Sequence, residues 1–130
     1  VWSPVAQGVL SGKYLPGKKP PAGSRATDKK SGAAMISRWM NDEILREVAK
    51  LEPIAQDCGL TMAQLAVAWV LQNSNVSSAI IGASKAKQVK ENVKAAGVKL
   101  SSDVMKAIDD AIGRIAERDP AKDVSPNPRP

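Results

Sequence analysis

The chain has 130 residues, of which 43% are hydrophobic, 25% charged and 3% aromatic, and it contains neither His nor Phe. This length supports one modest domain, whose core must come from Leu, Val, Ile and Ala. The absence of His excludes imidazole metal ligands, Ser/His/Asp triads and His acid–base catalysis. The single cysteine, Cys58, excludes an internal disulfide and a thiolate zinc site, which favours a reducing, cytoplasmic location. No apolar run has the length of a membrane span, so we expect no membrane partner.

The net charge of +6 is concentrated in two stretches. Residues 1–30 carry a net charge of +5 and residues 85–99 carry +4, whereas the remaining residues sum to −3. This distribution suggests one anion site assembled from two segments, although two solvated lysine-rich faces would explain it equally well. Nucleic acid is a less favoured partner, because no aromatic residue lies among the lysines of 85–99 to stack on bases.

The first predicted elements are a strand end and a long loop. Because residues 1–3 lead directly into turn residues, we expect position 1 to lie inside an element of an incomplete chain. Frequent Gly and Pro residues predict a loop over residues 3–31, with a short helical turn only at residues 5–11. Asn41 is then the expected N-cap of a helix that Pro53 kinks or restarts and Gly59 ends. Its predicted buried stripe is Ile44, Val48, Leu51, Ala55 and Cys58.

Three further helices and one strand follow. Thr61 and Gln64 form a capping box that begins a heavily buried helix ending near Leu71. Residues 76–81 read as a strand covered on both faces, as in a parallel sheet. Ser84 is the expected cap of a helix over residues 85–96. In this helix, Val89 and Val93 should face inward and the lysines outward. A last helix begins at Ser101 or Ser102, with a stripe of Val104, Ile108, Ile112 and Ile115, and residues 119–130 should form a flexible, proline-rich tail.

This alternation of strands and helices indicates the α/β class. Two strands cannot close a sheet, so a buried strand at residues 76–81 needs neighbours that the sequence does not supply. We therefore expect a missing N-terminal part.

Three segments carry candidate chemistry. Residues 2–8 end a strand in a turn whose amides and Ser3 hydroxyl could meet an anion. The loop places Lys13, Tyr14 and Arg25 near one another in sequence. Residues 81–85 run from a strand to a helix start, where free amides and the helix dipole favour phosphate. In a barrel the carboxyl ends of all strands open onto one face, so the first and third segments should meet there.

Together these segments resemble the C-terminal part of an aldo-keto reductase, in the branch that includes the β subunits of voltage-gated potassium channels and bacterial relatives. The resemblance covers residues 1–118. It rests on Trp-Ser-Pro-Val-Ala-Gln-Gly-Val-Leu-Ser-Gly-Lys-Tyr at 2–14, Ser-Arg-Ala at 24–26, Leu-Ala-Val-Ala-Trp-Val-Leu at 65–71, and Gly-Ala-Ser-Lys with Gln-Val-Lys-Glu-Asn within 82–92. It implies the last two β/α units of a (β/α)8 TIM barrel plus a closing helix at 102–117. A barrel of this kind needs about 250 residues.

The resemblance also implies an extended NADP(H) on the barrel's C-terminal face. Trp2 would lie near the nicotinamide, and Lys13 and Arg25 would neutralise the pyrophosphate from a loop folding over it. The residues implied to line the pyrophosphate are Ser3, Pro4, Val5, Ala6 and Gln7. Those implied at the adenosine end are Gly82, Ser84, Lys85, Gln88, Glu91 and Asn92, with Ser84 and Lys85 nearest the ribose phosphate.

The sequence departs from the family pattern at two places. Many relatives have Arg where Gln88 stands, which leaves the choice between NADPH and NADH open. The family's catalytic Asp, Tyr, Lys and His lie on earlier strands that no stretch here matches. We therefore assign this chain no catalytic residue and no metal ligand.

The resemblance implies the cofactor-binding part of an oxidoreductase that reduces aldehydes or ketones by hydride transfer. We expect the chain to be inactive by itself, with a small carbonyl compound as substrate of the complete barrel. The alternative is a non-catalytic accessory subunit that senses nicotinamide nucleotides, and the same residues would serve both functions. A basic nucleic-acid-binding module is the third hypothesis.

Overall fold

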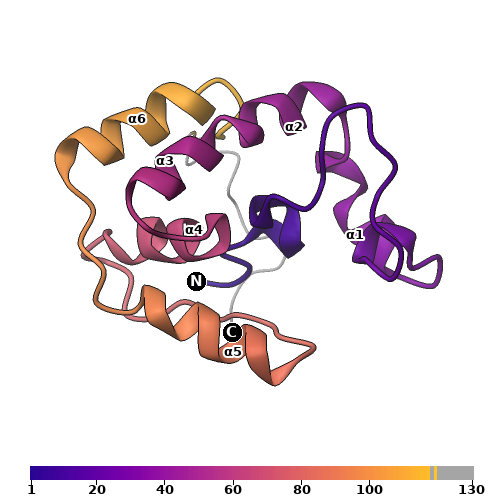
Figure 1. Cartoon of the computed structure of the whole chain (residues 1–130), viewed down its shortest axis with the longest axis horizontal. Helices are drawn as coiled ribbons and strands as arrows, with labels where there is room; N and C mark the ends of the chain where they lie inside the picture. Colours follow the sequence, from indigo (N-terminus) through magenta and orange to yellow (C-terminus); the bar gives the residue numbers. More distant parts are fainter. Residues whose placement is uncertain (118, 120–130) are drawn as a thin grey trace.

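The computed structural model describes residues 1–117 and 119, and within them it is predominantly helical (Figure 1). Of the predicted tail, residues 119–130, all but residue 119 lie outside the described residues. In chain order the elements are η1 (Ala6–Ser11), η2 (Arg25–Thr27), α1 (Gly32–Ile36), η3 (Ser37–Trp39), α2 (Asp42–Ala49), α3 (Leu51–Asp57), α4 (Met62–Leu71), α5 (Ala86–Asn92), η4 (Val93–Ala95) and α6 (Ser102–Ile112), where η denotes a 3₁₀ helix.

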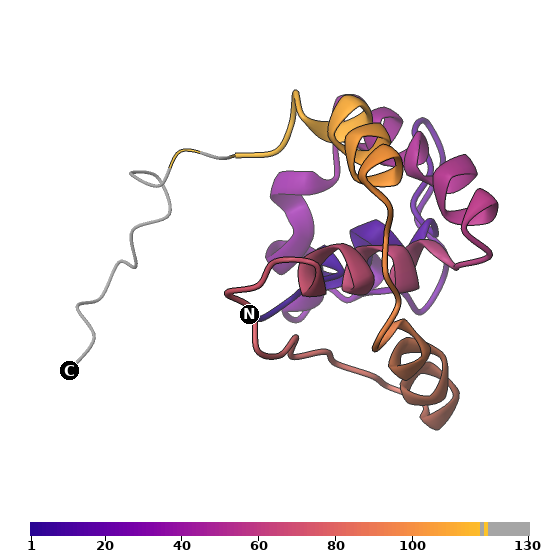
Figure 2. The same cartoon turned by 90° about the vertical axis from the view of Figure 1, so that its left-hand side faces the viewer.

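The helices are arranged around α4. Helix α6 packs on α2 and α3, and α4 contacts α3, α5 and η1. In Figure 1, α6 lies above α3, α4 lies in the middle, and α5 lies at the bottom. Figure 2 shows the extended segment that joins α5 to α6 running down the face of the molecule that is turned to the viewer.

Two hydrophobic clusters form the interior. The larger contains Val9, Tyr14, Ile36, Leu45, Val48, Leu51, Ala55, Met62, Leu65, Ile108 and Ala111. The smaller contains Val67, Ala68 and Ala95, with Val5, Ala79 and Ile81 among the partly buried residues packed against it. Helix α4 contributes to both clusters, which explains why its sequence leaves little polar face.

The predicted cap and end of the first long helix are confirmed, and Val48, Leu51 and Ala55 of its predicted stripe are buried. Ile44 and Cys58 of that stripe are only partly buried, and Leu45 is buried instead.

The Asn41 side chain accepts a hydrogen bond from the Ile44 amide (3.0 Å), and the helix is interrupted at Lys50, where α2 ends and α3 begins. Pro53 lies three positions into α3, where its missing N–H costs no intrahelical hydrogen bond. Gly59 ends the helix with a φ of 66°, a conformation that glycine adopts without strain.

Helix α4 is also confirmed, including its capping box. The Gln64 amide donates to the Thr61 hydroxyl (3.2 Å), and the Thr61 amide donates to the Gln64 side-chain oxygen (2.9 Å). Within the described part of the chain, no single helix is long and apolar enough to span a membrane. Only the stretch 42–57 taken together with α4 has that length and apolar composition, and the two are bent by 87° relative to one another.

The predicted strand at residues 76–81 is wrong in extent and in burial. Among residues 1–117 the structure has only an isolated parallel bridge, between Trp2 and Ile80. One face of this short segment is covered, because Ala79 and Ile81 pack on the smaller cluster, but Ile80 is 66% exposed. A strand is covered on both faces only when other elements pack on each face, and among the described residues only the face of Ala79 and Ile81 is packed.

Helix α5 differs from its prediction at three points. Its N-cap is Lys85 rather than Ser84, and the regular helix ends at Asn92, before η4. Val89 and Val93 do not face inward but are 52% and 61% exposed. Ala95 is instead the residue that is buried, at the contact with α4. In α6 the Ser101 hydroxyl accepts from the Val104 amide (3.3 Å), as a predicted cap should, and the helix ends at Ile112.

Candidate functional site

The candidate site begins where two chain segments pair in parallel. The Val1 nitrogen donates to the Ser78 carbonyl oxygen, and the Ile80 amide donates to the Val1 carbonyl oxygen, both at 2.8 Å. Because the segments are parallel, the turn after Trp2 and the turn after Ile81 leave the pair at the same end. The expectation that these two motif segments lie side by side is therefore supported for their strand ends.

The turn after Trp2 has an uncommon backbone. Ser3, Ala6 and Gln7 have φ values of 54°, 46° and 57°, in the left-handed region that side chains other than glycine rarely adopt. A hydrogen bond from the Gln7 side-chain amide to the Ser3 hydroxyl (2.7 Å) closes the turn. The Val5 amide donates no hydrogen bond within the described residues. Such strain clusters at ligand-binding turns, and mixed right- and left-handed residues create anion-binding concavities.

Lys13 lies against this turn. A Cβ atom built on Gly8 would stand 3.0 Å from the Lys13 Nζ, so the ammonium group approaches the turn as closely as a glycine permits. The same Nζ lies 5.3 Å from the centre of the Tyr14 ring. The Tyr14 ring is buried in the larger cluster and so fixes the stem of Lys13 beside the turn.

The loop that carries Arg25 is hydrogen-bonded to Tyr14, the residue after Lys13. The Ala26 amide donates to the Tyr14 hydroxyl (3.4 Å), which brings Arg25 next to the segment of Lys13. The Arg25 guanidinium is exposed and contacts the Met35 sulfur at 3.6 Å. Gly32 fits only because it lacks a side chain, since a Cβ there would stand 2.6 Å from the Arg25 carbonyl oxygen.

Asp28 organises the segment between Arg25 and Gly32. Its carboxylate accepts from the amides of Lys30 and Gly32, both at 3.0 Å, and from the Ser31 hydroxyl. The hydrogen bond from Lys30, followed by that from Gly32, lowers the pKa of Asp28 below its ordinary value. The loop is thus ordered by an ionised side chain.

The second turn, residues 82–88, is held by its own glutamine. The Gln88 side-chain oxygen accepts from the Ser84 amide (2.8 Å), the Lys85 amide (3.1 Å) and the Ser84 hydroxyl (3.2 Å). The Gln88 oxygen thus occupies the donors that were expected to meet a ribose phosphate. Gly82, Ser84, Lys85 and Gln88 are all exposed or partly exposed.

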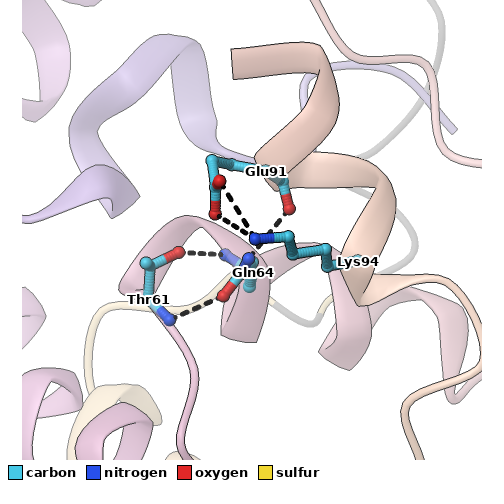
Figure 3. A network of polar contacts seen from close by, with 4 residues as sticks. All are labelled: Thr61, Gln64, Glu91 and Lys94. Atoms are coloured by element: carbon cyan, nitrogen blue, oxygen red, sulfur yellow. Dashed lines mark hydrogen bonds and ion pairs between the residues drawn. The ribbon is translucent and has the colours of Figure 1, made fainter. Parts of the chain in front are cut away.

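Helix α5 is anchored to α4 by Gln64, the buried polar residue of the core (Figure 3). Its side-chain nitrogen donates to the Glu91 carbonyl oxygen at 2.8 Å, while its oxygen serves the capping box. The Glu91 carboxylate pairs with Lys94 (3.0 Å), and Asn92 is partly buried. Sequence reasoning found Gln64 as a cap but missed this contact, for which a glutamine in an otherwise apolar helix was the available signal.

The structure brings the predicted residues into two groups. The first comprises Trp2, Ser3, Pro4, Val5, Ala6, Gln7 and Lys13; the second comprises Gly82, Ser84, Lys85, Gln88, Glu91 and Asn92. Arg25 lies in the adjoining loop, where its guanidinium contacts Met35 rather than a residue of the turn. Helix α4 links the groups, since it contacts both η1 and α5. Among the described residues, no group of three or more Cys, Asp or Glu side chains could hold a metal ion. The lysine and the free amide of the first group suit an anionic ligand, whereas Lys85 and Glu91 leave the second group without net charge.

Comparison with known proteins decides the family. The sequence profile of the aldo/keto reductase family matches residues 1–112. The chain belongs to the aldo/keto reductase family. This confirms the resemblance found in the sequence. The family implies a TIM barrel, but the described residues are helical with one isolated parallel bridge and no extended strand, so they do not show the barrel portion.

Three relatives of this aldo/keto reductase chain are all described as voltage-gated potassium channel β subunits. The chain is 46% identical over 97 residues to proteins named voltage-gated potassium channel subunit beta from Arabidopsis thaliana and from Oryza sativa subsp. japonica; in each, the match covers 75% of this chain and 29% of the relative. A protein of the same name from Schizosaccharomyces pombe is 42% identical over 115 residues, with 86% of this chain and 33% of the relative covered. The chain thus spans about a third of the length of these curated relatives.

Proposed function

We propose that this chain is the NADP(H)-binding portion of an oxidoreductase that reduces aldehydes or ketones. In this assignment residues 1–118 are the C-terminal, cofactor-binding part of an aldo/keto reductase barrel. The family generally binds NADP(H), and the question for this chain is whether its own residues suit that ligand.

The observation that carries the proposal is the Ser3–Gly8 turn with Lys13 beside it. The turn holds its strained backbone through the Ser3–Gln7 hydrogen bond, and the Lys13 ammonium is packed against Gly8. A diphosphate needs hydrogen-bond donors and positive charge at one place, and this turn offers both. Arg25, in the adjoining loop, supplies a second cation for the same group.

The second turn would receive the adenosine end. Lys85 is exposed and Ser84 offers a hydroxyl next to it. A ribose phosphate would have to displace the Gln88 oxygen from the Ser84 and Lys85 amides, or bind through the side chains alone. We therefore expect a smaller preference for NADPH over NADH than an arginine at position 88 would give.

In the complete barrel, the nicotinamide would deliver hydride to a small carbonyl substrate while an acid protonates the oxygen. The residues of this chain bind and orient the cofactor in that reaction. We expect no turnover from residues 1–130 by themselves, because the family's catalytic residues lie on strands that this sequence does not match.

The test is a titration of the 130-residue chain with NADPH, followed by cofactor fluorescence and calorimetry. We expect saturable binding that Lys13→Ala weakens about tenfold, equivalent to one charge-assisted contact of about 1.4 kcal/mol. Lys18→Ala is the matched control, because Lys18 is an exposed lysine of the same loop.

Absence of NADPH binding, or equal losses in the Lys13 and Lys18 variants, would refute the proposal. Reductase turnover by the chain alone with NADPH and a small aldehyde would refute the assignment of catalysis to other residues. Duplex DNA added at low salt serves as a specificity control, since tight, salt-sensitive binding there would favour the nucleic-acid hypothesis.

A second candidate function is supported by the names of the relatives, which are channel β subunits. Under this proposal the complete protein binds the nucleotide as an accessory subunit and its occupancy, rather than turnover, matters. A complete barrel that binds NADPH tightly but fails to oxidise it with any of a panel of aldehydes would favour this function over the reductase.

A further inference from the structure

Met35 is the methionine that the fold leaves most open to solvent. The structure describes all four methionines of the chain. Met35 is 50% exposed, whereas Met62 is 8% exposed and Met40 and Met105 are partly buried. An oxidant must reach the sulfur atom to react with it, so exposure decides which methionine reacts first. We therefore expect oxidation of this chain to begin at Met35.

The Met35 sulfur contacts Arg25, one of the two cations that we assign to the diphosphate. The Arg25 Nη1 donates to this sulfur at 3.6 Å, and within the described residues no oxygen atom accepts from the same guanidinium. The Arg25 stem lies against α1, because its Cγ would stand 2.8 Å from a Cβ atom on Gly32. Met35 follows Gly32 by about one helical turn, on the same face of α1. Helix α1 thus holds the stem at its start and the guanidinium one turn later.

The chemical state of the sulfur decides how firmly Arg25 is held. A thioether is a weak acceptor, so Arg25 leaves it for an anion at small cost. A sulfoxide carries a polar oxygen on the same sulfur, and hydrogen bonds from a charged donor are the stronger ones. Oxidation therefore converts a contact that releases the guanidinium into one that retains it.

We propose that Met35 is a site of reversible oxidation by peroxides, and that its sulfoxide captures Arg25 and lowers the affinity of the chain for NADP(H). The peroxide transfers one oxygen atom to the sulfur: its O–O bond breaks, an S=O bond forms, the sulfur gives up two electrons, and the peroxide leaves as water. Methionine sulfoxide reductases reverse the oxidation. The effect on NADP(H) rests on the proposed function, whereas the capture of Arg25 does not.

The first measurement is limited oxidation with hydrogen peroxide, followed by mass spectrometry of tryptic peptides. Trypsin places the four methionines in separate peptides, because a Lys or Arg lies between each successive pair. Met35 should gain its oxygen atom at least roughly threefold faster than any other methionine.

NMR of the arginine side chains tests the capture in the absence of nucleotide. In the oxidised chain, the guanidinium signals of Arg25 should shift, and their exchange with water should slow about threefold. Arg46, which pairs with Asp42 at 3.5 Å, is the internal reference and should not change. Met35→Leu should abolish the change at Arg25, whereas Met105→Leu, at a partly buried methionine of α6, should retain it.

Titration with NADPH tests the consequence for the cofactor. Oxidation should weaken binding about fivefold in the parent chain and in Met105→Leu, but not in Met35→Leu. Met35→Gln places an amide oxygen beside Arg25 and should weaken binding without peroxide. In Arg25→Ala, oxidation should cause no further loss, because no guanidinium remains to be captured. A Cys58→Ser chain should respond as the parent does, since the thiol is not the target.

Faster oxidation of another methionine, unchanged Arg25 signals after oxidation, or equal peroxide sensitivity of the parent and Met35→Leu would overturn the proposal. Absence of NADPH binding before oxidation would instead refute the cofactor function. The Arg25 signals would then still decide whether the sulfoxide captures the guanidinium.

Discussion

At the scale of single residues, the strained backbone of the Ser3–Gly8 turn points to ligand binding rather than to packing alone. Left-handed backbone costs roughly 1–3 kcal/mol for each residue other than glycine, and Ser3, Ala6 and Gln7 all adopt it. The surroundings that hold the turn include buried Pro4 and Val9 and the Ser3–Gln7 hydrogen bond. Such a turn is costly to stability, so its persistence favours a role in binding.

Gly8→Ala should displace Lys13 and weaken NADPH binding about tenfold, since the new methyl group would stand 3.0 Å from the Lys13 Nζ. It should also cost about 1–2 kcal/mol of unfolding free energy, because Gly8 has a φ of 100°. Calorimetry with NADPH and urea unfolding measure the two effects.

Gly17→Ala is the matched control for Gly8→Ala. Gly17 also has positive φ, at 66°, but nothing lies within 4 Å of the position that a Cβ atom would occupy there. The control should lose stability and keep its NADPH affinity. Equal affinity losses in both variants would show that backbone strain, rather than the position of Lys13, controls binding.

Asp28 gives the loop a predictable pH dependence. Hydrogen bonds from the backbone lower its pKa in the folded state, so its contribution to loop order is present above the pKa of the unfolded chain. That contribution is lost as pH falls through the lower, folded-state pKa. The protection factor of the Gly32 amide, which compares its exchange with the intrinsic rate at the same pH and is measured by NMR, should therefore fall in this acidic window.

The Asp28→Asn variant tests whether ionisation is the cause. An amide oxygen still accepts from Gly32 but does not titrate, so the loss of Gly32 protection at acidic pH should vanish. If the variant retains the same acid dependence, another group controls the loop.

At the scale of elements, Gln64 joins two helices with one side chain (Figure 3). Its oxygen caps α4 and its nitrogen holds the Glu91 carbonyl of α5 at 2.8 Å. Because α5 carries Gln88 and follows the Ser84 turn, this contact positions the part of the candidate site that we propose for the adenosine end.

Gln64→Glu should keep the cap and lose the donor to Glu91, at a cost of about 1–3 kcal/mol in unfolding free energy near neutral pH. As pH falls, protonation of the introduced carboxyl restores a donor, so the deficit should shrink. Urea unfolding at several pH values measures this deficit.

Gln56→Glu is the control, at an exposed position of α3. Its unfolding free energy should stay within about 0.5 kcal/mol of the parent at every pH.

Local signals were sufficient for α2, α4 and α6, because the caps at Asn41, Thr61 and Ser101 act within three residues of each helix start. They failed for α5. Ser84 satisfied every local rule for an N-cap, but the Gln88 oxygen bonds the Ser84 and Lys85 amides and moves the helix start to Ala86. The Gln88 side chain reaches back to the Lys85 amide and so places the cap at Lys85, a residue type that N-cap preferences do not favour.

At the scale of the whole molecule, the two hydrophobic clusters are joined by the segment between η4 and α6. Leu100 packs on both clusters. The Gln72 side chain brackets the same segment, donating to the Val98 carbonyl (3.0 Å) and accepting from the Leu100 amide (3.3 Å). Helix α5 and η4 thus depend for their position on the segment between η4 and α6 and on Gln64.

Leu100→Ala should lower the stability of the chain by about 2 kcal/mol and uncouple the clusters. Native-state hydrogen exchange should then show η4 and α5 opening at lower free energy than α3 and α4. Leu60→Ala is the control, because it removes a leucine packed on the larger cluster only. It should lower the opening free energies of η4 and α5 and of α3 and α4 together. A uniform loss in the Leu100 variant would mean that one cooperative unit spans both clusters.

The sequence by itself determined the family and the helices whose caps are local, and it supplied the residues that we propose for cofactor binding. Tertiary structure decided what depends on distant partners: the exposure of Val89 and Val93, the reduction of the predicted strand to the Trp2–Ile80 bridge, and the contact of Lys13 with Gly8. The physical reason is that a helix satisfies its backbone within its own segment, whereas a strand is completed only by its neighbours.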